Sequence, residues 1–171
     1  SPDGSSITQT VSTNHDGQYG RSNSLVKADD NTYILSYNGN SNYGRIQTFT
    51  IPPDGTSITE VANAAFSDNS YSYWNSMVQV DHDTYVNAGY SYNTSGTNGY
   101  YGVLETFTIP LDGASITSVA TLKYTDQNVG THNKLFKLNA SEYLLAYEGA
   151  NGDGFIEMYT ISSNGATITK K

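Results

Sequence analysis

Hydrophobic and polar residues alternate in short runs along the chain, and turn-forming residues interrupt every run. The run Thr-Tyr-Ile-Leu-Ser-Tyr at 32–37, for example, ends at Asn38 and Gly39. Runs rich in Val, Ile, Thr, Tyr and Phe that end at Asp, Asn, Gly or Pro are typical of β-strands joined by turns. We therefore expect an all-β chain whose first four strands lie at 23–28, 32–37, 45–51 and 57–61.

These strands belong to a unit that occurs three times. The segment RIQTFTIPPDGTSITEV (45–61) returns as VLETFTIPLDGASITSV (103–119) and as FIEMYTISSNGATITKK (155–171). A second block begins at Asn23 and returns at Asn75 and Asn133, so the repeat spans 52 residues the first time and 58 the second. A fixed period of this length is the signature of a repeat architecture.

Turn residues divide each unit into a four-stranded meander. The sequences PPDG and PLDG place Pro at the second and Gly at the fourth turn position, which predicts a hairpin between the third and fourth strands. Longer polar segments, such as STNHDGQYGRS (12–22), are long enough to cross to the next unit. We expect one repeat domain over 1–171, made of an outer strand with a crossing at 1–22 and three blades at 23–61, 75–119 and 133–171.

The order TYILSYNG, GRIQTFTIPPDG and ITEV resembles β-propeller blades of the YVTN or lactonase-like kind. The resemblance covers nearly the whole chain and implies four-stranded antiparallel blades around an axis, without implying an activity. Closed rings contain about 4 to 8 blades, so three blades imply a partial or oligomer-completed propeller. A β-trefoil or a β-prism, closed within one chain, is the alternative fold.

The charge of the chain restricts its partners. It has 16 acidic and 8 basic side chains, a net charge of -8, and neither Lys nor Arg at 46–122. Because phosphate groups bind to positive surfaces, we expect neither nucleic acid nor membrane insertion. The absence of Cys rules out disulfides. Together with the low Lys content and the polar Asn, Ser, Thr and Tyr side chains, it favours an extracellular or cell-surface protein.

Candidate binding residues fall on one face of the predicted blades. In an antiparallel meander, the crossings and the loops between the second and third strands emerge on the same side, and binding sites occur preferentially on such loops. Aromatic rings beside Asn, Asp and Ser suit sugars, which have an apolar face and a polar rim; packing between blades is the alternative role. The candidate ligand-binding residues are Tyr19, Tyr71, Tyr73, Trp74, Tyr92, Tyr100, Tyr101 and His132.

An Asp stands seven residues before the Asn that opens each unit. The pairs are Asp16 with Asn23, Asp68 with Asn75, and Asp126 with Asn133. A feature repeated with the blade usually serves the blade, so we expect the Asp to cap the crossing and the Asn to hold the entry to the inner strand. A repeated ligand or Ca²⁺ site is the functional alternative. We predict no metal site and no cofactor.

Familiar catalytic motifs are missing from the sequence. The chain has three separated His, no Cys and none of the patterns Gly-x-Ser-x-Gly, Gly-x-Gly-x-x-Gly or His-Glu-x-x-His, so we predict no catalytic residue and no enzyme. We expect a non-enzymatic extracellular module for adhesion or structural self-assembly, with another copy of the chain as partner. A glycan-binding propeller lectin is the alternative, and a hydrolase or lactonase-like enzyme is the third hypothesis.

Overall fold

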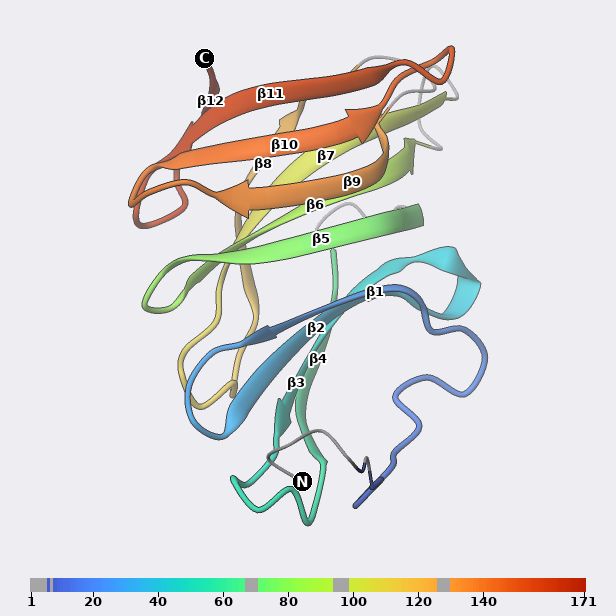
Figure 1. The fold of residues 1–171 in the computed structure, drawn as a ribbon, viewed down its shortest axis with the longest axis vertical. Coiled ribbons are helices and arrows are strands. Elements are labelled where there is room, and N and C mark those ends of the chain that lie inside the picture. The colour runs from blue at the N-terminus through green and yellow to red at the C-terminus, as the bar shows by residue number, and fades with distance from the viewer. Residues whose placement is uncertain (1–5, 7, 67–70, 94–98, 126–129) are drawn as a thin grey trace.

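The computed structural model describes residues 6, 8–66, 71–93, 99–125 and 130–171. These residues form three four-stranded antiparallel sheets, which we call blades 1, 2 and 3 (Figure 1), and the all-β prediction is confirmed. Blade 1 contains β1 (Arg21–Lys27), β2 (Thr32–Asn38), β3 (Gly44–Thr50) and β4 (Thr59–Ala65). Blade 2 contains β5 (Tyr71–Asp81), β6 (Thr84–Asn93), β7 (Gly99–Thr108) and β8 (Thr117–Lys123). Blade 3 contains β9 (Thr131–Lys137), β10 (Glu142–Glu148), β11 (Gly154–Ile161) and β12 (Ile168–Lys170).

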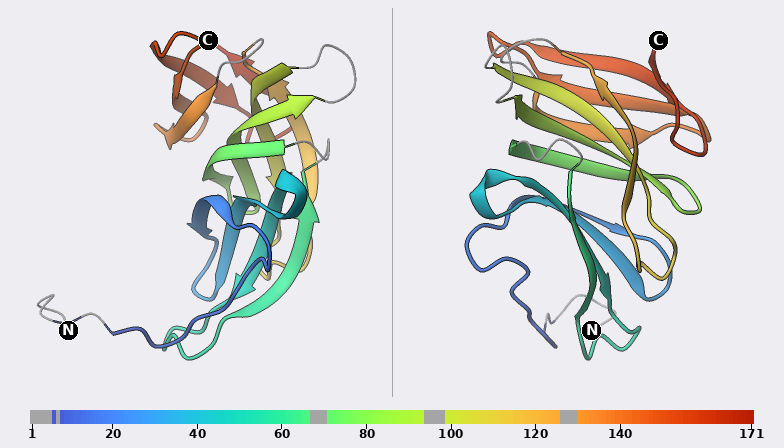
Figure 2. Two further views of the ribbon diagram at one scale, coloured as in Figure 1. Left: turned by 90° about the vertical axis from the view of Figure 1, so that its right-hand side faces the viewer. Right: turned by 180° about the vertical axis from the view of Figure 1, so that it is seen from behind.

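Each blade is a meander in which strands adjacent in sequence are adjacent in the sheet. The blades stack in chain order, with inner strand β1 beside β5 and β5 beside β9 (Figure 2). This is a propeller-like array. Every strand ladder found in the described residues joins strands of one unit, so the interlocked barrel of a β-trefoil is not formed there. The three described sheets stack in a row and do not close around an axis as the sheets of a β-prism do (Figure 2).

The segment before β1 differs from its prediction. Residues 8–20 contain no strand, so the outer strand expected in this region is not formed in the residues that the structure describes. Each sheet already holds its own four strands, and a strand without a neighbour cannot pair its backbone groups. Thr10 instead donates a side-chain hydrogen bond of 3.1 Å to the backbone oxygen of Gly55.

Repeated hydrophobic positions hold the blades together. Ile34 and Ile46 of blade 1 are buried against Tyr85 and Phe107 of blade 2. The equivalent residues of blade 2 are packed in the same way against blade 3, in a cluster that includes Val86, Leu104, Tyr143 and Tyr159. Burying each such side chain contributes about 1.5–3 kcal/mol.

Repeated hydrogen bonds fix the angle between blades. Thr48 Oγ1 donates to the backbone oxygen of Gly113 at 2.7 Å, and Thr106 Oγ1 donates to that of Gly165 at the same distance. Both glycines have positive φ, 69° and 71°, as the predicted hairpins require. On the inner strands, Ser24 Oγ accepts from the backbone of the next blade at 2.9 Å, and Ser76 Oγ does the same.

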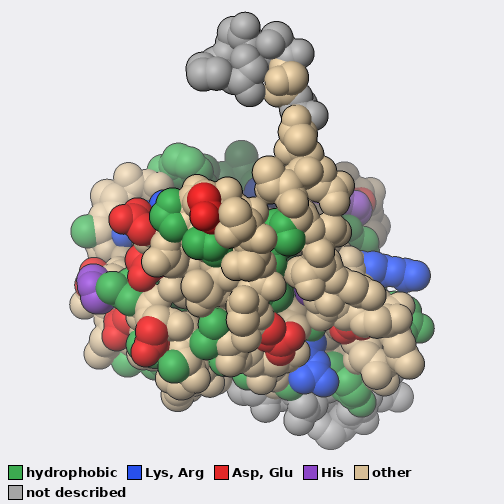
Figure 3. Space-filling view, turned by 90° about the horizontal axis from the view of Figure 1, so that it is seen from below, with side chains coloured by type: hydrophobic (Ala, Val, Ile, Leu, Met, Phe, Trp, Pro, Cys, Tyr) green, Lys and Arg blue, Asp and Glu red, His purple; other side chains and the backbone are tan. Residues whose placement is uncertain are grey.

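The surface at the blade 1 end is mostly uncharged and polar, with separate carboxylates and few basic groups (Figure 3). Within the described residues, the one helical segment is the three-residue 3₁₀ turn η1 (Asn40–Asn42). No helix found there is long and apolar enough to cross a membrane.

Candidate functional site

A bulge occurs where each inner strand begins. The pairing registers of β1, β5 and β9 all shift at this point, and one residue in each bulge has a left-handed backbone. These residues are Ser22 (φ 56°), Trp74 (φ 52°) and His132 (φ 54°). A positive φ is uncommon outside glycine, and such strain gathers at ligand sites where the surrounding structure holds it in place. Its presence in all three units indicates that the bulge belongs to the repeat.

The three bulges enclose a cavity of about 210 Å³, which we call the axial cavity. Residues from all three blades contribute to it, because their inner strands begin beside one another. Its lining consists of Ser22, Asn23, Trp74, Asn75, His132, Asn133 and Lys134.

Two buried amides in this lining have unused donors. Asn75 and Asn133 are only 6% and 2% exposed. The Asn75 Oδ1 accepts from Ser72 Oγ at 2.8 Å and Asn87 Nδ2 at 3.0 Å, and the Asn133 Oδ1 accepts from the Tyr124 hydroxyl at 2.5 Å. These bonds orient both amides and leave each Nδ2 without a partner. An unpaired buried donor costs about 1–3 kcal/mol, so an acceptor that reached these groups would be stabilised.

A row of aromatic rings leads away from the axial cavity. The Trp74 ring lies 4.9 Å from that of His132 and 5.4 Å from that of Tyr90, measured between centroids. Tyr90 stacks on Tyr100 at 4.8 Å, and Tyr100 contacts Tyr92 at 4.6 Å. The row therefore joins the axial cavity to β6 and β7.

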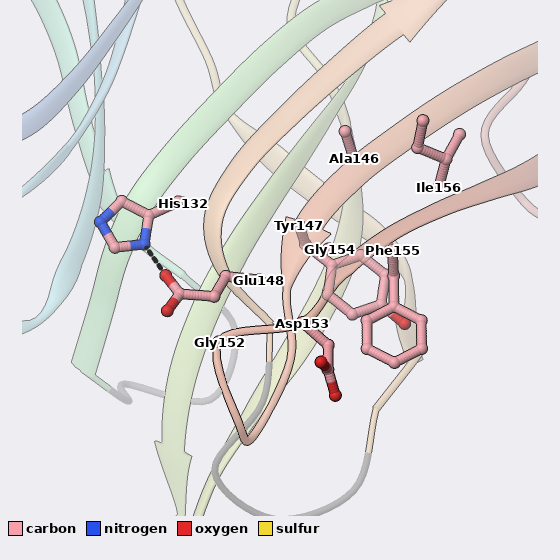
Figure 4. A pocket seen from close by; sticks show the side chains of 9 residues that line it. All are labelled: His132, Ala146, Tyr147, Glu148, Gly152, Asp153, Gly154, Phe155 and Ile156. Atoms are coloured by element: carbon pink, nitrogen blue, oxygen red, sulfur yellow. Dashed lines mark ion pairs between the residues drawn. The ribbon is translucent and has the colours of Figure 1, made fainter.

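A second cavity of about 420 Å³, the blade 3 pocket, lies beside β10 and β11 (Figure 4). The His132 Nδ1 pairs with the Glu148 carboxylate at 2.6 Å, and Asp153 supplies a second carboxylate. Phe155, which is 43% exposed, stacks on Tyr147 at 5.3 Å. The full lining is His132, Ala146, Tyr147, Glu148, Gly152, Asp153, Gly154, Phe155 and Ile156.

A hydrogen bond to Glu157 fixes the position of the Tyr147 ring. The Tyr147 hydroxyl donates to Glu157 Oε1 at 2.8 Å, and Lys170 Nζ lies 2.6 Å from the same oxygen. Burial and the Glu157 charge raise the pKa of Tyr147. Burial acts to raise the pKa of Glu157 as well, but its bonds to Lys170 and to two tyrosine hydroxyls outweigh this effect and lower it. Tyr147 therefore remains a neutral donor, and its ring is a fixed support for Phe155.

Some of the predicted aromatic residues lie away from the axial cavity. Tyr73 contacts Trp74 at 5.8 Å, whereas Tyr101 lies under the Lys123 ammonium group at 4.6 Å and Tyr19 under the Arg21 guanidinium at 5.4 Å. The structure describes only the backbone of Tyr71, which pairs with Tyr92. Trp74 and His132 are thus the two members of the predicted set that line the axial cavity.

Of the repeated Asp and Asn positions, Asp16 and Asn23 bind backbone groups, whereas Asn75 and Asn133 accept hydrogen bonds from side chains. Asp16 accepts hydrogen bonds from the backbone of Gln18, Tyr19 and Asn40 at 2.8–3.1 Å. Burial acts to raise the pKa of Asp16, but these donors lower it on balance. The Asn23 Nδ2 donates to the backbone oxygen of Gly20 at 3.0 Å. The equivalent residues Asp68 and Asp126 lie outside the described residues.

Sequence reasoning missed several lining residues, although one signal was present. Glu148 and Tyr90 stand at the same repeat position, which is Asn38 in blade 1. This position lies in the second strand of every unit, and its residue type changes from Asn to Tyr to Glu between copies. Comparing the copies for such changes would have found both residues. Lys134 also departs from the repeat, since it replaces Ser24 and Ser76, whereas Asp153 lies in a loop between the repeated segments.

Comparisons with known proteins establish the architecture. No family model matches the chain, and no curated protein matches it. Among solved structures, an endo-1,4-β-xylanase from Bacteroides thetaiotaomicron is similar over 95% of this chain, with a TM-score of 0.59 and 15% identity. An α-L-arabinofuranosidase from Lactobacillus brevis covers 88% (TM-score 0.48, 8% identity), and an exo-1,5-α-L-arabinanase from a bovine ruminal metagenomic library covers 91% (TM-score 0.47, 9% identity). The chain spans 62% of the xylanase chain, 53% of the arabinofuranosidase chain and 59% of the arabinanase chain.

The similarity to the xylanase structure overturns the predicted function. The prediction of a non-enzymatic module for adhesion or self-assembly is wrong, and so is the prediction that excluded an enzyme, because the architecture is shared with a carbohydrate-active enzyme. The prediction of another copy of the chain as partner depended on self-assembly, so it no longer has support. The absence of catalytic motifs does not exclude an enzyme, because some reactions, such as glycoside hydrolysis, use only two carboxyl groups placed by the fold.

Proposed function

We propose that the chain is part of a carbohydrate-active protein and binds a neutral glycan at the axial cavity. The contact between the Trp74 and His132 rings, beside the buried amides of Asn75 and Asn133, carries this proposal. A sugar ring offers an apolar face to an aromatic ring and hydroxyl oxygens to amide donors. The shared architecture with a xylanase supports the same class of ligand.

Charge favours an uncharged sugar over an acidic one. Glu148 and Asp153 line the adjoining pocket, and Lys134 is the basic side chain in the axial lining. The net charge of -8 adds a long-range repulsion of anions. Sugars that carry carboxylates are therefore expected to bind more weakly than neutral sugars of the same length.

Trp74 provides a direct test, because it is the only Trp of the chain. Titration with neutral xylo-oligosaccharides should change its fluorescence, and polygalacturonate should have little effect. Calorimetry on Trp74→Ala should show binding weakened about tenfold or more, since a ring contact and its buried area are lost. Tyr19→Ala is the matched control, because Tyr19 lines neither cavity. Equal affinity in Trp74→Ala and the unmodified chain would refute the proposal.

Hydrolysis of the bound glycan is a second candidate function, supported by Glu148 and Asp153 in one pocket. Glycosidases use one carboxyl group as an acid and another as a base or nucleophile. In this proposal the His132 contact positions Glu148, and Asp153 supplies the second group. If so, Glu148→Gln or Asp153→Asn should reduce the release of reducing ends from xylan by about 100-fold or more. Glu60→Gln, which changes an exposed carboxylate on β4, is the control and should retain the rate. If the unmodified chain itself releases no reducing ends from xylan, hydrolysis by this chain is excluded.

The extracellular or cell-surface location and the YVTN or lactonase-like relationship also remain proposals. The first is supported by the lack of Cys and the low Lys content, and the second by the repeated blade motif. Fractionation of the native host would test the location.

A further inference from the structure

We propose that the axial cavity and the blade 3 pocket are two adjoining subsites of one cleft, which holds consecutive sugar units of a linear neutral oligosaccharide on either side of His132. This inference rests on the proposed glycan binding and extends it, because it specifies a ligand of at least two units and a direction across the molecule.

His132 lies at the boundary between the two cavities. It lines both of them, with the Trp74 ring 4.9 Å away toward the axial cavity and the Glu148 carboxylate 2.6 Å away in the blade 3 pocket. Its left-handed backbone sets the ring at this junction, and the bond to Glu148 orients it. The imidazole is therefore the boundary that both sugar units would contact.

The two cavities offer complementary chemistry. The axial cavity is lined by Asn75 and Asn133, whose buried amide nitrogens lack partners, whereas the blade 3 pocket is lined by the carboxylates of Glu148 and Asp153 beside the exposed ring of Phe155. A sugar hydroxyl both donates and accepts, so one chain could satisfy the two sets. The axial cavity, at about 210 Å³, is smaller than most ligand sites, which measure about 300–1,000 Å³, and suits a single unit.

The outer face of blade 3 differs from the faces that hold another blade. Where blades 1 and 2 have Ser24 and Ser76 to bond the next blade, blade 3 has Lys134. Where they have the hydroxyls of Thr48 and Thr106, it has Met158. Blade 3 thus lacks, at both repeated positions, the hydroxyl group that bonds the next blade. This difference favours a ligand pocket on the face rather than a buried joint.

The length of the ligand provides the test. We would measure the affinity of the full chain for xylose, xylobiose, xylotriose and xylotetraose by Trp74 fluorescence and by calorimetry. The affinity should rise about tenfold or more from xylose to xylobiose or xylotriose and then level off. Equal affinity for xylose and the longer chains would overturn the two-subsite cleft while leaving glycan binding intact. Failure of every neutral saccharide to bind would refute the proposed function itself, and the cleft with it.

Phe155→Ala separates the blade 3 pocket from the axial cavity. The ratio of xylotriose affinity to xylose affinity should fall close to one, because the second unit loses its aromatic surface. Phe136→Ala is the matched control, since this exposed ring lies on the same blade but lines neither cavity, and it should retain the ratio. A ratio unchanged in Phe155→Ala would overturn the inference. Thermal unfolding of both variants would verify that they fold.

Discussion

At the scale of single residues, one glycine position shows how the blades depend on close contacts. An added Cβ at Gly44 would lie 2.3 Å from the Phe66 ring, and at Gly102 it would lie 2.2 Å from the Tyr124 ring. The repeat equivalent in blade 3, Gly154, has nothing within 4 Å. The aromatic residue after the fourth strand therefore packs directly on the backbone of the third strand in blades 1 and 2.

Gly102→Ala should consequently destabilise the chain. Overpacking of this kind costs about 1–3 kcal/mol, and the displaced Tyr124 would also strain its 2.5 Å bond to Asn133. Gly154→Ala is the matched control and should change stability by less than about 0.5 kcal/mol. Urea unfolding followed by far-ultraviolet circular dichroism measures both. Equal stabilities of the two variants would show that the Tyr124 ring moves aside freely.

Residue identity also explains what could be predicted from the sequence. The strands and the Gly113 and Gly165 hairpins could be predicted because alternation and turn chemistry are local properties. The axial cavity could not, because it joins Ser22, Trp74 and His132, which are more than fifty residues apart and meet only when the blades stack. The aromatic residues next to the repeated Asn do indicate Trp74 and His132 as separate candidates, but the contact between their rings depends on the stacking of blades 2 and 3.

At the scale of strands, Glu157 joins three of the four strands of blade 3. Its carboxylate accepts from Tyr147 on β10, from Tyr159 on β11 and from Lys170 on β12. β12 has only three residues and three register pairs with β11, so this ionic contact adds to a short backbone attachment.

The attachment of β12 should weaken in acid. The pKa of Glu157 in the folded chain lies below its ordinary value of 4.5, since the bonds that lower it outweigh its burial. A lowered pKa stabilises the fold above the unfolded-state value, and this stabilisation is lost as the pH falls from about 4.5 through the folded pKa. The urea midpoint of the unmodified chain should therefore fall between pH 5 and pH 3.

Glu157→Gln isolates this contribution. The variant should be less stable at pH 7, and its urea midpoint should change less between pH 5 and pH 3 than that of the unmodified chain. Other carboxylates with lowered pKa, including Asp16, Asp29 and Glu142, would keep part of the dependence in both chains. An identical pH profile in Glu157→Gln would contradict this account of β12.

At the scale of the whole molecule, the described residues form two joints between blades, and the outer faces of blades 1 and 3 lie at the ends of the stack. Leu104 and Ile156 occupy the same repeat position, yet Leu104 is completely buried in the joint between blades 2 and 3, whereas Ile156 on the outer face is 70% exposed. The same repeat position is therefore buried between blades in blade 2 and exposed to solvent in blade 3.

Truncating the two side chains should reveal this difference. Leu104→Ala should cost about 2–5 kcal/mol, because it removes buried methyl groups and leaves a cavity. Ile156→Ala should cost less than about 1 kcal/mol, since little buried area is lost. Chemical unfolding of both variants gives the comparison. A large loss in Ile156→Ala would mean that something covers the outer face in solution.

The repeated bonds from Thr48 to Gly113 and from Thr106 to Gly165 join each blade only to the one that follows. Cooperativity in such a stack passes from neighbour to neighbour, as in other repeat proteins. Blade 2, supported from both sides, would then be the last unit whose amides exchange with solvent, and the two end blades would open first. The axial cavity draws on all three units, so opening of either end blade would dismantle it before the middle blade unfolds.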